Sequence, residues 1–446
     1  MSREIKPKWR LANMKGKRIE ISRLFSHHRF KSEIAISFVT LFCFAGVVEA
    51  QMYSVLHDFG GAPGDGSYPY DSLLQSGSLL YGLTFGGGTG AGINGFGLGT
   101  IFDYNLATNT ESVLYSFQGG SSDGANPTGS LIQSGSTLYG LTDDTGGIDV
   151  ASTIFQYDLG TDAESVLYSF PGGIRASGEL AQSGSNLYGQ GIYQYSLQTG
   201  VLHYLPGSQS AGVTYGSLIL SGSILYGMTE TGGSKNDGTI FEYNLATDKE
   251  STLYSFGTSL NGGEFPAGSL ILSGSTLYGM TTGGGYEGTG TIFEYNLNTS
   301  IETVLHSFSG YPDDGSYPYG SLILSGPTLY GMTELGGANR GNGSGYGTIF
   351  EYDLTTNTES LLHSFDQSDG AFPQGSLIQS GLSLYGMTEQ GGTNGEGVIF
   401  SLTVPEPTST AMLAVASVGL LVRRRRNVTL LLSRSASPRR SNPPAS

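Results

Sequence analysis

Residues 268–308 contain the pattern that decides the fold. They read GSLILSGSTLYGMT at 268–281, a Gly-rich loop, TIFEYNL at 291–297, a short turn, and ETVLHSF at 302–308. These stretches hold four short runs rich in Leu, Ile, Val, Tyr and Phe, each bounded by Gly, Ser, Asn or Thr. Such runs predict four β-strands joined by turns, which we term the first to fourth strands of a unit.

The same unit occurs seven times between residues 51 and 403. Leu-Tyr-Gly marks each second strand, with its tyrosine at Tyr81, Tyr139, Tyr188, Tyr226, Tyr278, Tyr330 and Tyr385. The third strand begins with Ile-Phe or Ile-Tyr, at Ile101, Ile154, Ile192, Ile240, Ile292, Ile349 and Ile399. Repeats of roughly this length are typical of β-propellers and related arrays.

Two details of the unit favour blades packed side by side. Apolar residues occupy adjacent as well as alternate positions, as in Val304-Leu305, so both faces of each sheet need cover. A Gly stands between the first and second strands of every copy, as at Gly274, and supplies the positive φ of a tight hairpin.

The two ends of the repeat region predict a closed ring. The last unit ends after its third strand, near Leu402, while residues 53–59 read as a fourth strand that precedes the first unit. An N-terminal strand that completes the last blade would remove its open edge. We therefore predict an all-β, seven-bladed propeller of four-stranded blades over residues 51–403. The alternative, an open solenoid, would need polar caps, and the sequence shows none.

Alternating strands place two kinds of loop on one side of the ring, which we term the loop face. These are the loops between second and third strands and the loops that link one unit to the next. The linking loops carry an Asp followed by Gly and then Pro, with the aspartates at Asp65, Asp123, Asp314 and Asp369. Asp oxygens and loop carbonyls could bind Ca²⁺, and Asp-Gly is also an ordinary turn signature. These four residues are the candidate calcium ligands, and no other cofactor is predicted.

Four histidines align with one position of the fourth strand. His57, His203, His306 and His363 occupy the place that is Tyr115, Tyr168 or Tyr254 in other units. A position that accepts either ring predicts a packing or hydrogen-bonding role, and no Ser-His-Asp arrangement can be assembled from it.

Charge argues against a nucleic-acid partner. Residues 51–403 hold four Lys/Arg against 32 Asp/Glu, so the body carries about −28 formal charge and repels phosphate. The single Cys is Cys43, in the leader, so the body has no thiol for disulfides or metal binding.

The N-terminal 50 residues have the layout of a secretory signal peptide. A long basic leader, in which Met14 is an alternative start to Met1, precedes an apolar run at 34–48 and the small residue Ala50. We expect cleavage between Ala50 and Gln51. A membrane anchor is the alternative, but about 15 apolar residues are short for a spanning helix.

The C-terminal end has three parts in order. Pro405-Glu406-Pro407 is followed by an apolar stretch within 408–422 and by Arg423, Arg424, Arg425 and Arg426. Residues 404–426 resemble the PEP-CTERM sorting signal of Gram-negative bacteria. The resemblance implies an exosortase partner, transient inner-membrane anchoring through 408–422 as a transmembrane segment, and delivery to the cell surface or extracellular matrix. An ordinary C-terminal anchor is the alternative, and residues 427–446 are expected to form a disordered tail.

The repeat itself resembles the GloVer tandem repeat of anchored surface proteins. The resemblance rests on the Tyr-Gly-Met-Thr, Gly-Gly and Gly-Thr-Ile-Phe elements and spans 51–402, and the third strand with its turn is also similar to kelch blades. It implies an exported surface protein and transfers no catalytic residue.

The expected function is an exported binding or structural module that associates with exopolysaccharide or other surface glycans. Exposed tyrosines and Gly/Asn/Ser loops suit stacking and hydrogen bonding to sugars. The alternatives are a polysaccharide lyase or hydrolase on a propeller scaffold and a purely architectural protein. We identify no catalytic residues.

Overall fold

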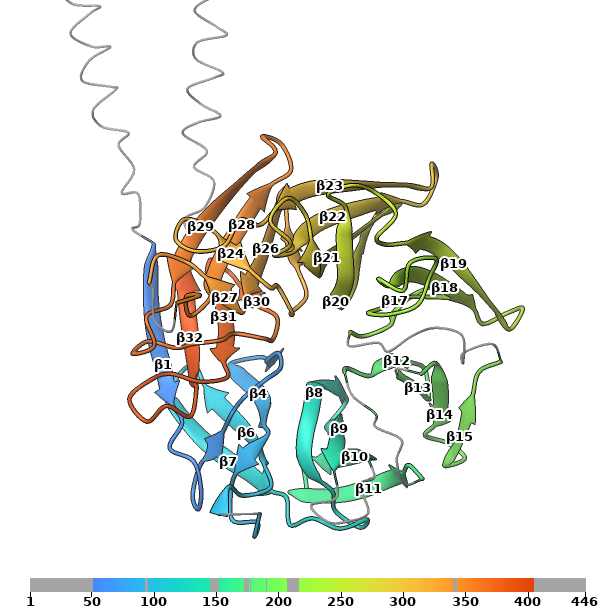
Figure 1. Ribbon diagram of the computed structural model, residues 1–446. Coiled ribbons are helices and arrows are strands. Elements are labelled where there is room, and N and C mark those ends of the chain that lie inside the picture. The colour runs from blue at the N-terminus through green and yellow to red at the C-terminus, as the bar shows by residue number, and fades with distance from the viewer. Residues whose placement is uncertain are drawn as a thin grey trace, which may run out of the picture. The chain divides into compact units, whose positions relative to one another are not determined.

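The computed structural model describes residues 51–404 except 93–94, 145–151, 172–175, 177, 190, 207–215 and 340–342. The described residues form seven four-stranded antiparallel sheets that follow one another around a ring in chain order (Figure 1). The predicted seven-bladed β-propeller is confirmed. The predicted leader at 1–50 and the sorting segment and tail from 405 to 446 lie outside the described residues.

Each blade takes its first to fourth strands in sequence order, except the last. Blade 1 contains β3 (Leu74–Ser76), β4 (Leu79–Thr84), β6 (Thr100–Asn105) and β7 (Thr110–Ser116). Blade 2 contains β8 (Ala125–Ser134), β9 (Thr137–Asp144), β10 (Thr153–Asp158) and β11 (Ala163–Ser169). Blade 3 contains β12 (Ala181–Ser183), β13 (Asn186–Gly189), β14 (Tyr193–Ser196) and β15 (Val201–Tyr204). Blade 4 contains β16 (Ile219–Ser221), β17 (Ile224–Thr229), β18 (Thr239–Asn244) and β19 (Lys249–Ser255).

The remaining blades follow the same order. Blade 5 contains β20 (Gly263–Ser273), β21 (Thr276–Gly284), β22 (Thr291–Asn296) and β23 (Ile301–Ser307). Blade 6 contains β25 (Ile323–Ser325), β26 (Thr328–Thr333), β28 (Thr348–Asp353) and β29 (Thr358–Ser364). Blade 7 contains β30 (Ile378–Ser380), β31 (Ser383–Thr388) and β32 (Val398–Thr403), and its fourth strand is β1 (Met52–Asp58).

The N-terminal strand closes the ring as predicted. Strand β1 pairs antiparallel with β32, with Met52 opposite Thr403 and Asp58 opposite Val398. The blue and red ends of the described chain therefore lie in one sheet (Figure 1). The strand spans 52–58 rather than the predicted 53–59, and Phe59, which follows it, is fully buried.

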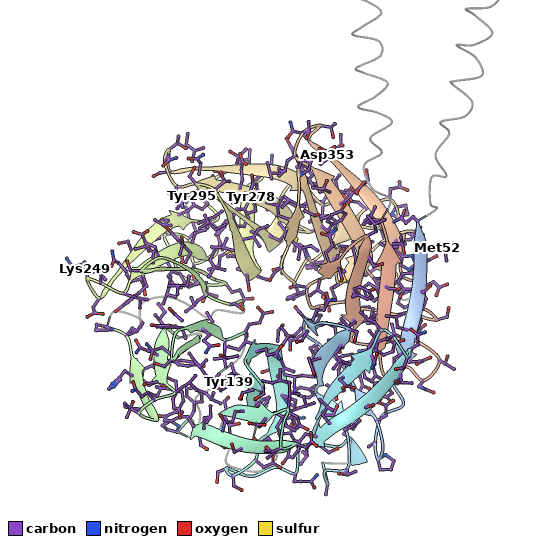
Figure 2. The ribbon with its side chains drawn as sticks, turned by 180° about the vertical axis from the view of Figure 1, so that it is seen from behind. Met52, Tyr139, Lys249, Tyr278, Tyr295 and Asp353 are labelled. Atoms are coloured by element: carbon purple, nitrogen blue, oxygen red, sulfur yellow. The ribbon has the colours of Figure 1, made fainter. Side chains whose placement is uncertain are left out.

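The core lies between neighbouring blades, which explains the adjacent apolar residues in the sequence. Between blades 4 and 5, for example, Ile240 and Phe256 pack against Leu277 and Phe293, all four nearly or fully buried. Side chains fill the space between successive sheets in this way around the ring (Figure 2). Each sheet is thus covered on both faces, as expected for blades of a propeller.

A β-bulge in the fourth strand helps to join one blade to the next. In blade 1 the register shifts between Ile101 and Phe102, so that Leu114 is the extra residue of β7. The carbonyl oxygen of Leu114 accepts a hydrogen bond of 3.4 Å from the Tyr157 hydroxyl of blade 2. The corresponding bond from Tyr295 to Leu253 is 3.1 Å. The bulge thus presents a backbone acceptor to the buried tyrosine of the following blade.

The predicted hairpin glycines have the expected conformation. The seven glycines between first and second strands have φ between 57° and 62°, in the left-handed region. No helix in the described part of the chain has the length and apolar character needed to cross a bilayer.

Candidate functional site

The loop face of blades 1 and 6 is ordered by strand pairing between its loops. In blade 1 the linking loop contributes β2 (Gly66–Ser67), which pairs with β5 (Gly86–Gly87) of the loop between second and third strands. In blade 6, β24 (Gly315–Ser316) pairs with β27 (Leu335–Gly336) in the same manner. The two kinds of loop that define the face are therefore joined by backbone hydrogen bonds.

Five connections between blades, two of which extend into the first strands β8 and β20, hold a non-glycine residue in the left-handed backbone conformation directly before a proline. These residues, with φ between 53° and 56°, are Tyr68, Asn126, Phe265, Tyr317 and Phe372. Left-handed backbone costs a non-glycine residue about 1–2 kcal/mol, and four of the five carry aromatic rings. Such strain persists only where the surroundings hold the residue in place.

Neighbouring loops hold these residues from both sides. The backbone N–H of Tyr317 donates to the carbonyl of Thr289 in blade 5 at 2.9 Å, and its carbonyl accepts from the N–H of Glu334 in blade 6 at 3.1 Å. Tyr68 has the same arrangement, with Glu396 at 2.9 Å and Phe85 at 3.1 Å. The linking loop thus fixes an aromatic residue on the loop face at both of these blade junctions.

Large apolar side chains remain exposed on this face. Phe96 is 56% exposed and stacks on Tyr68 at 5.7 Å, and Tyr286 is 77% exposed. Tyr311, Tyr317 and Tyr319 each keep 38–39% of their surface. Exposed aromatic rings on ordered loops are suited to contact a ligand with apolar faces and polar edges.

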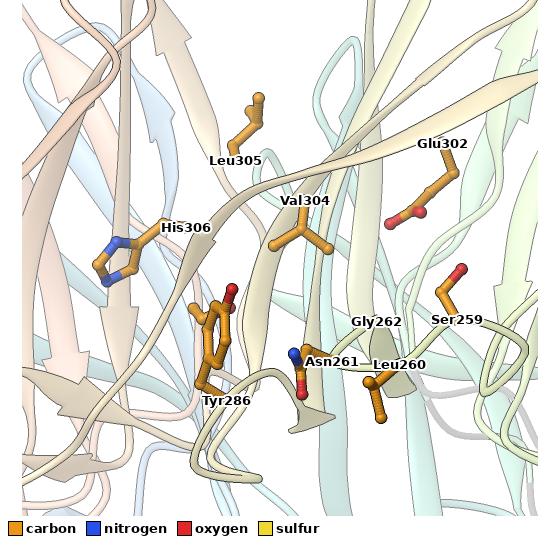
Figure 3. Close-up of a pocket in the computed structure, with 10 residues that line it drawn as sticks. Ser259, Leu260, Asn261, Gly262, Tyr286, Glu302, Val304, Leu305 and His306 are labelled. Carbon is orange, nitrogen blue, oxygen red and sulfur yellow. The ribbon is translucent and has the colours of Figure 1, made fainter.

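A groove of about 580 Å³ lies between the loops of blades 4 and 5. Its lining comes from the linking loop at Ser259–Gly262, from Tyr286 between β21 and β22, and from strand β23 between Glu302 and Ser307. Glu302, Val304 and His306 follow β23 along one side, with Tyr286, Asn261 and Leu260 across from them (Figure 3). The groove thus places a flat exposed ring beside amide, hydroxyl and carboxyl groups.

Tyr254 and burial control the carboxyl group in this groove. Burial raises the pKa of Glu302, and the hydrogen bond that the Tyr254 hydroxyl donates at 3.2 Å opposes this rise. Glu302 is therefore tied to blade 4 by one oxygen.

The structure places the four candidate calcium ligands in separate loops, each paired with the ring of its preceding fourth strand. Asp65, Asp314 and Asp369 contact the Nε2 atoms of His57, His306 and His363 at 3.2, 3.1 and 2.9 Å. Asp123 accepts from the Tyr115 hydroxyl at 2.9 Å. The aspartates also accept backbone N–H bonds of their own turns, as Asp65 does from Gly60 and Gly66. The interpretation of Asp-Gly as a turn signature expects such bonds. The calcium hypothesis remains a prediction.

The hydrogen bonds change the electrostatics of two of these aspartates. Burial by itself raises the pKa of Asp65, but the hydrogen bonds from His57 and from the Gly60 N–H outweigh it and lower the pKa below its usual value. Asp314 shows the same balance with His306 and Ser309.

One alignment made from the sequence is wrong. His203 does not occupy the position of the other three histidines, because strand β15 is short and lacks the bulge of the other blades. His203 lies opposite Gln194 and is exposed, whereas His57 lies opposite Ile399.

A ring of serine hydrogen bonds lines the inner ends of the blades. The backbone N–H of one serine donates to the hydroxyl of the serine in the next blade, at 2.7 Å from Ser217 to Ser269 and from Ser269 to Ser321. The ring continues through Ser376, whose N–H donates to the Ser72 hydroxyl at 2.8 Å. Preceding glycines allow this approach, since a Cβ on Gly268 would lie 2.3 Å from the carbonyl oxygen of Gly320.

Two acidic residues break the repeat at this inner ring. Glu179 replaces the serine in blade 3, and its carboxylate accepts hydrogen bonds from Ser72 at 3.4 Å, from Ser130 at 2.5 Å and from Ser217. Asp71 replaces the glycine in blade 1 and accepts from the Gly129 N–H at 2.6 Å. Burial, together with the charge of Glu179, raises the pKa of Asp71 to about 7, although the Gly129 bond opposes the rise.

The repeat and the sorting signal both match known families. The Gloeobacter/Verrucomicrobia repeat model matches residues 40–191 and 190–400, which is most of the chain. The chain belongs to this repeat family. The model of the PEP-CTERM protein-sorting motif matches residues 403–426. This motif implies export and sorting to the surface of a Gram-negative bacterium. A comparison with curated proteins found no match.

A solved structure with a TM-score above 0.5 supports the fold of this repeat protein. An oligogalacturonate lyase in complex with manganese is 14% identical, with a TM-score of 0.51 over 79% of this chain and 93% of that one. The oligogalacturonate lyase of Vibrio parahaemolyticus is 10% identical, with a TM-score of 0.48 over 79% and 94%. At these identities the likeness extends to the fold alone.

Sequence reasoning missed the left-handed aromatic residues and the two inner carboxyl groups. The aromatic residues had a readable signal, since Tyr or Phe precedes proline in four linking loops. The sequence signal for Asp71 and Glu179 was weaker: each replaces one residue of the Gly-Ser-Leu motif with which most units begin.

Proposed function

We propose that this repeat protein is a surface or matrix module that binds neutral polysaccharide along its loop face. The observation that carries the proposal is Tyr286, 77% exposed beside a groove that also presents Asn261, Ser259 and Glu302. Sugar rings stack on such side chains, and amide and carboxyl groups accept and donate bonds to hydroxyls. The strongly acidic body disfavours polyanionic glycans, so neutral chains are the matching class.

Affinity electrophoresis of the full chain in gels that contain neutral polysaccharides tests this proposal. We expect wild-type protein to be retarded, and Tyr286→Ala to lose about 3–10-fold in affinity, the share of one stacking contact. Val201→Ala, which changes a 43% exposed side chain on strand β15 of blade 3, is the control and should bind as wild type. The absence of retardation with every neutral polysaccharide would contradict the proposal.

We propose further that both ends of the chain are processed during export. Signal cleavage would occur between Ala50 and Gln51. Residues 408–422 would anchor the protein transiently in the membrane, and an exosortase that recognises Pro405-Glu406-Pro407 would release it from this anchor. Mass spectrometry of protein isolated from a host with an exosortase tests both steps. Glu406→Ala should retain the C-terminal segment, and Thr408→Ala should be processed as wild type.

The alternative of a polysaccharide-degrading enzyme finds support in one place, the inner carboxyl pair. Asp71, with a pKa of about 7, can hold a proton near neutrality, and Glu179 supplies a second carboxyl group. Reducing-end release from polysaccharide that is lost in Asp71→Asn would favour an enzyme. Binding without any turnover favours the module.

A further inference from the structure

Two clusters of metal-ligand side chains occur at equivalent places in the repeat. One contains His57, Asp65 and Glu111, and the other contains His306, Asp314 and Glu359. Within each cluster, one ligand atom from every residue lies within 4.8 Å of the others. The first lies where β1 of blade 7 meets blade 1, and the second where blade 5 meets blade 6.

The imidazole and the aspartate have the separation of two ligands on one ion. His57 Nε2 lies 3.2 Å from Asp65 Oδ2, and His306 Nε2 lies 3.1 Å from Asp314 Oδ2. Two ligand atoms about 2.0–2.1 Å from a tetrahedral Zn²⁺ lie about 3.3 Å apart.

Backbone bonds orient both aspartates toward the histidines. Asp65 accepts from the N–H of Gly60 at 2.7 Å and of Gly66 at 2.6 Å. Asp314 accepts from Ser309 at 2.8 Å and from Gly315 at 2.7 Å. Such outer bonds fix a ligating carboxylate in position, as in established metal sites.

The third residue offers an oxygen that no protein group satisfies. Oε1 of Glu111 and Oε1 of Glu359 are buried and accept no hydrogen bond in the described structure. Glu164 and Glu302 have the same unpartnered oxygen, but there Tyr115 and Tyr254 replace the histidine. Only the His57 and His306 clusters therefore add an imidazole nitrogen to the two carboxylates within the described residues.

The third His-Asp pair provides a natural comparison. His363 contacts Asp369 at 2.9 Å, but Tyr53 stands where Glu111 stands in blade 1. The Tyr53 ring stacks on His363 at 3.9 Å and donates its hydroxyl to the Asp369 carbonyl at 2.7 Å. This junction holds an aromatic stack in place of a third ligand.

We propose that the His57-Asp65-Glu111 and His306-Asp314-Glu359 clusters bind divalent transition-metal ions of the zinc type. One imidazole with two carboxylates suits Zn²⁺, whereas Ca²⁺ takes oxygen ligands in larger number. An ion at the first cluster links the closing strand β1, through His57, to strand β7 of blade 1, through Glu111. It would therefore strengthen the closure of the ring.

Zinc binding by the chelator-treated full chain tests the proposal, measured by equilibrium dialysis against ZnCl₂ with metal analysis. We compare wild type with His57→Tyr, His306→Tyr and the double variant. Tyrosine is the natural residue at this position in blades 1, 2 and 4, so these variants are expected to fold, which circular dichroism checks. His363→Tyr is the matched control, since its junction has only two of the three ligands.

We expect each single variant to lose one of the two structural equivalents, the double variant to lose both, and His363→Tyr to lose neither. Zinc bound elsewhere on the chain is common to all variants and is subtracted as the baseline of the double variant. Zinc should also raise the melting temperature of wild type, and by less in His57→Tyr. Equal zinc stoichiometry in wild type and the double variant would overturn the proposal. So would a melting shift caused by CaCl₂ and not by ZnCl₂.

Discussion

A Cβ atom on Gly279 would lie 2.6 Å from Cζ of Phe293, and in the sheet the two residues face each other across strands β21 and β22. The same contact recurs in other blades, as between Gly331 and Phe350, where the distance is 2.5 Å. The Gly of Leu-Tyr-Gly therefore leaves the space that the Phe of Ile-Phe fills. This contact explains why the two sequence motifs occur together in the repeat.

Replacing this glycine should overpack the blade. We expect Gly279→Ala to destabilise the protein by about 1–3 kcal/mol, because the buried Phe293 has no free space into which to move. Chemical denaturation of the full chain measures the effect. In the double variant Gly279→Ala/Phe293→Leu the smaller side chain should accept the methyl group, so the two effects should not add. Strict additivity would show that the two residues do not compete for the same space.

The repeat made the fold predictable from sequence, because each motif could be compared in seven contexts. The position of Leu-Tyr-Gly and the missing last strand, replaced by residues near Tyr53, were sufficient to predict the closed ring. His203 was misaligned because nothing in the sequence near Val201 indicates that strand β15 is shorter than the other fourth strands.

The candidate sites were less predictable, because they depend on contacts between units. Asp65 and Glu111 are 46 positions apart, and His57 comes from strand β1 of blade 7 while Glu111 lies on strand β7 of blade 1, so only the packing of the blades brings the three together. The left-handed φ of Tyr317 depends on hydrogen bonds to Thr289 and Glu334. Neither arrangement follows from local propensity.

The strained residue before Pro318 can be tested by exchanging its side chain. Tyr317 has a φ of 55°, and the equivalent residue in blade 2 is Asn126. Tyr317→Asn and Tyr317→Val both remove the ring, but only asparagine tolerates the left-handed region. We expect the valine variant to be less stable than the asparagine variant by about 1–2 kcal/mol in denaturant titrations. Equal stability of the two would mean that the backbone relaxes out of this conformation.

Glu164 should make stability depend on pH. Burial, with a contribution from the charge of Asp123, raises its pKa from 4.5 to about 8. The folded state therefore holds a proton that the unfolded state releases above pH 4.5, so this group stabilises the fold in acid. Its contribution is lost as pH rises through about 8.

Thermal unfolding of wild type and Glu164→Gln at pH 5.5 and pH 8.5 measures this effect. The glutamine variant should gain stability relative to wild type at the higher pH, since it carries no charge to bury. Asp353→Asn is the control, because the backbone N–H bond from Thr355 lowers the pKa of Asp353 from 3.8, well below both measurement conditions. Its difference from wild type should therefore be the same at both pH values. A difference between Glu164→Gln and wild type that is independent of pH would contradict the assignment.

Glu179 should be the most sensitive position of the inner ring. Three serine hydroxyls donate to its carboxylate, so an apolar residue would leave them without this acceptor. We expect Glu179→Leu to cost at least about 2–3 kcal/mol, since each unsatisfied buried polar group costs about 1–3 kcal/mol. Glu179→Ser restores the residue found at Ser217 and Ser269 and should cost less, because its hydroxyl can join the ring of serine bonds. Denaturant titration of both variants compares their stabilities. If the serine variant is as unstable as the leucine variant, blade 3 needs the longer carboxylate to reach Ser72 and Ser130.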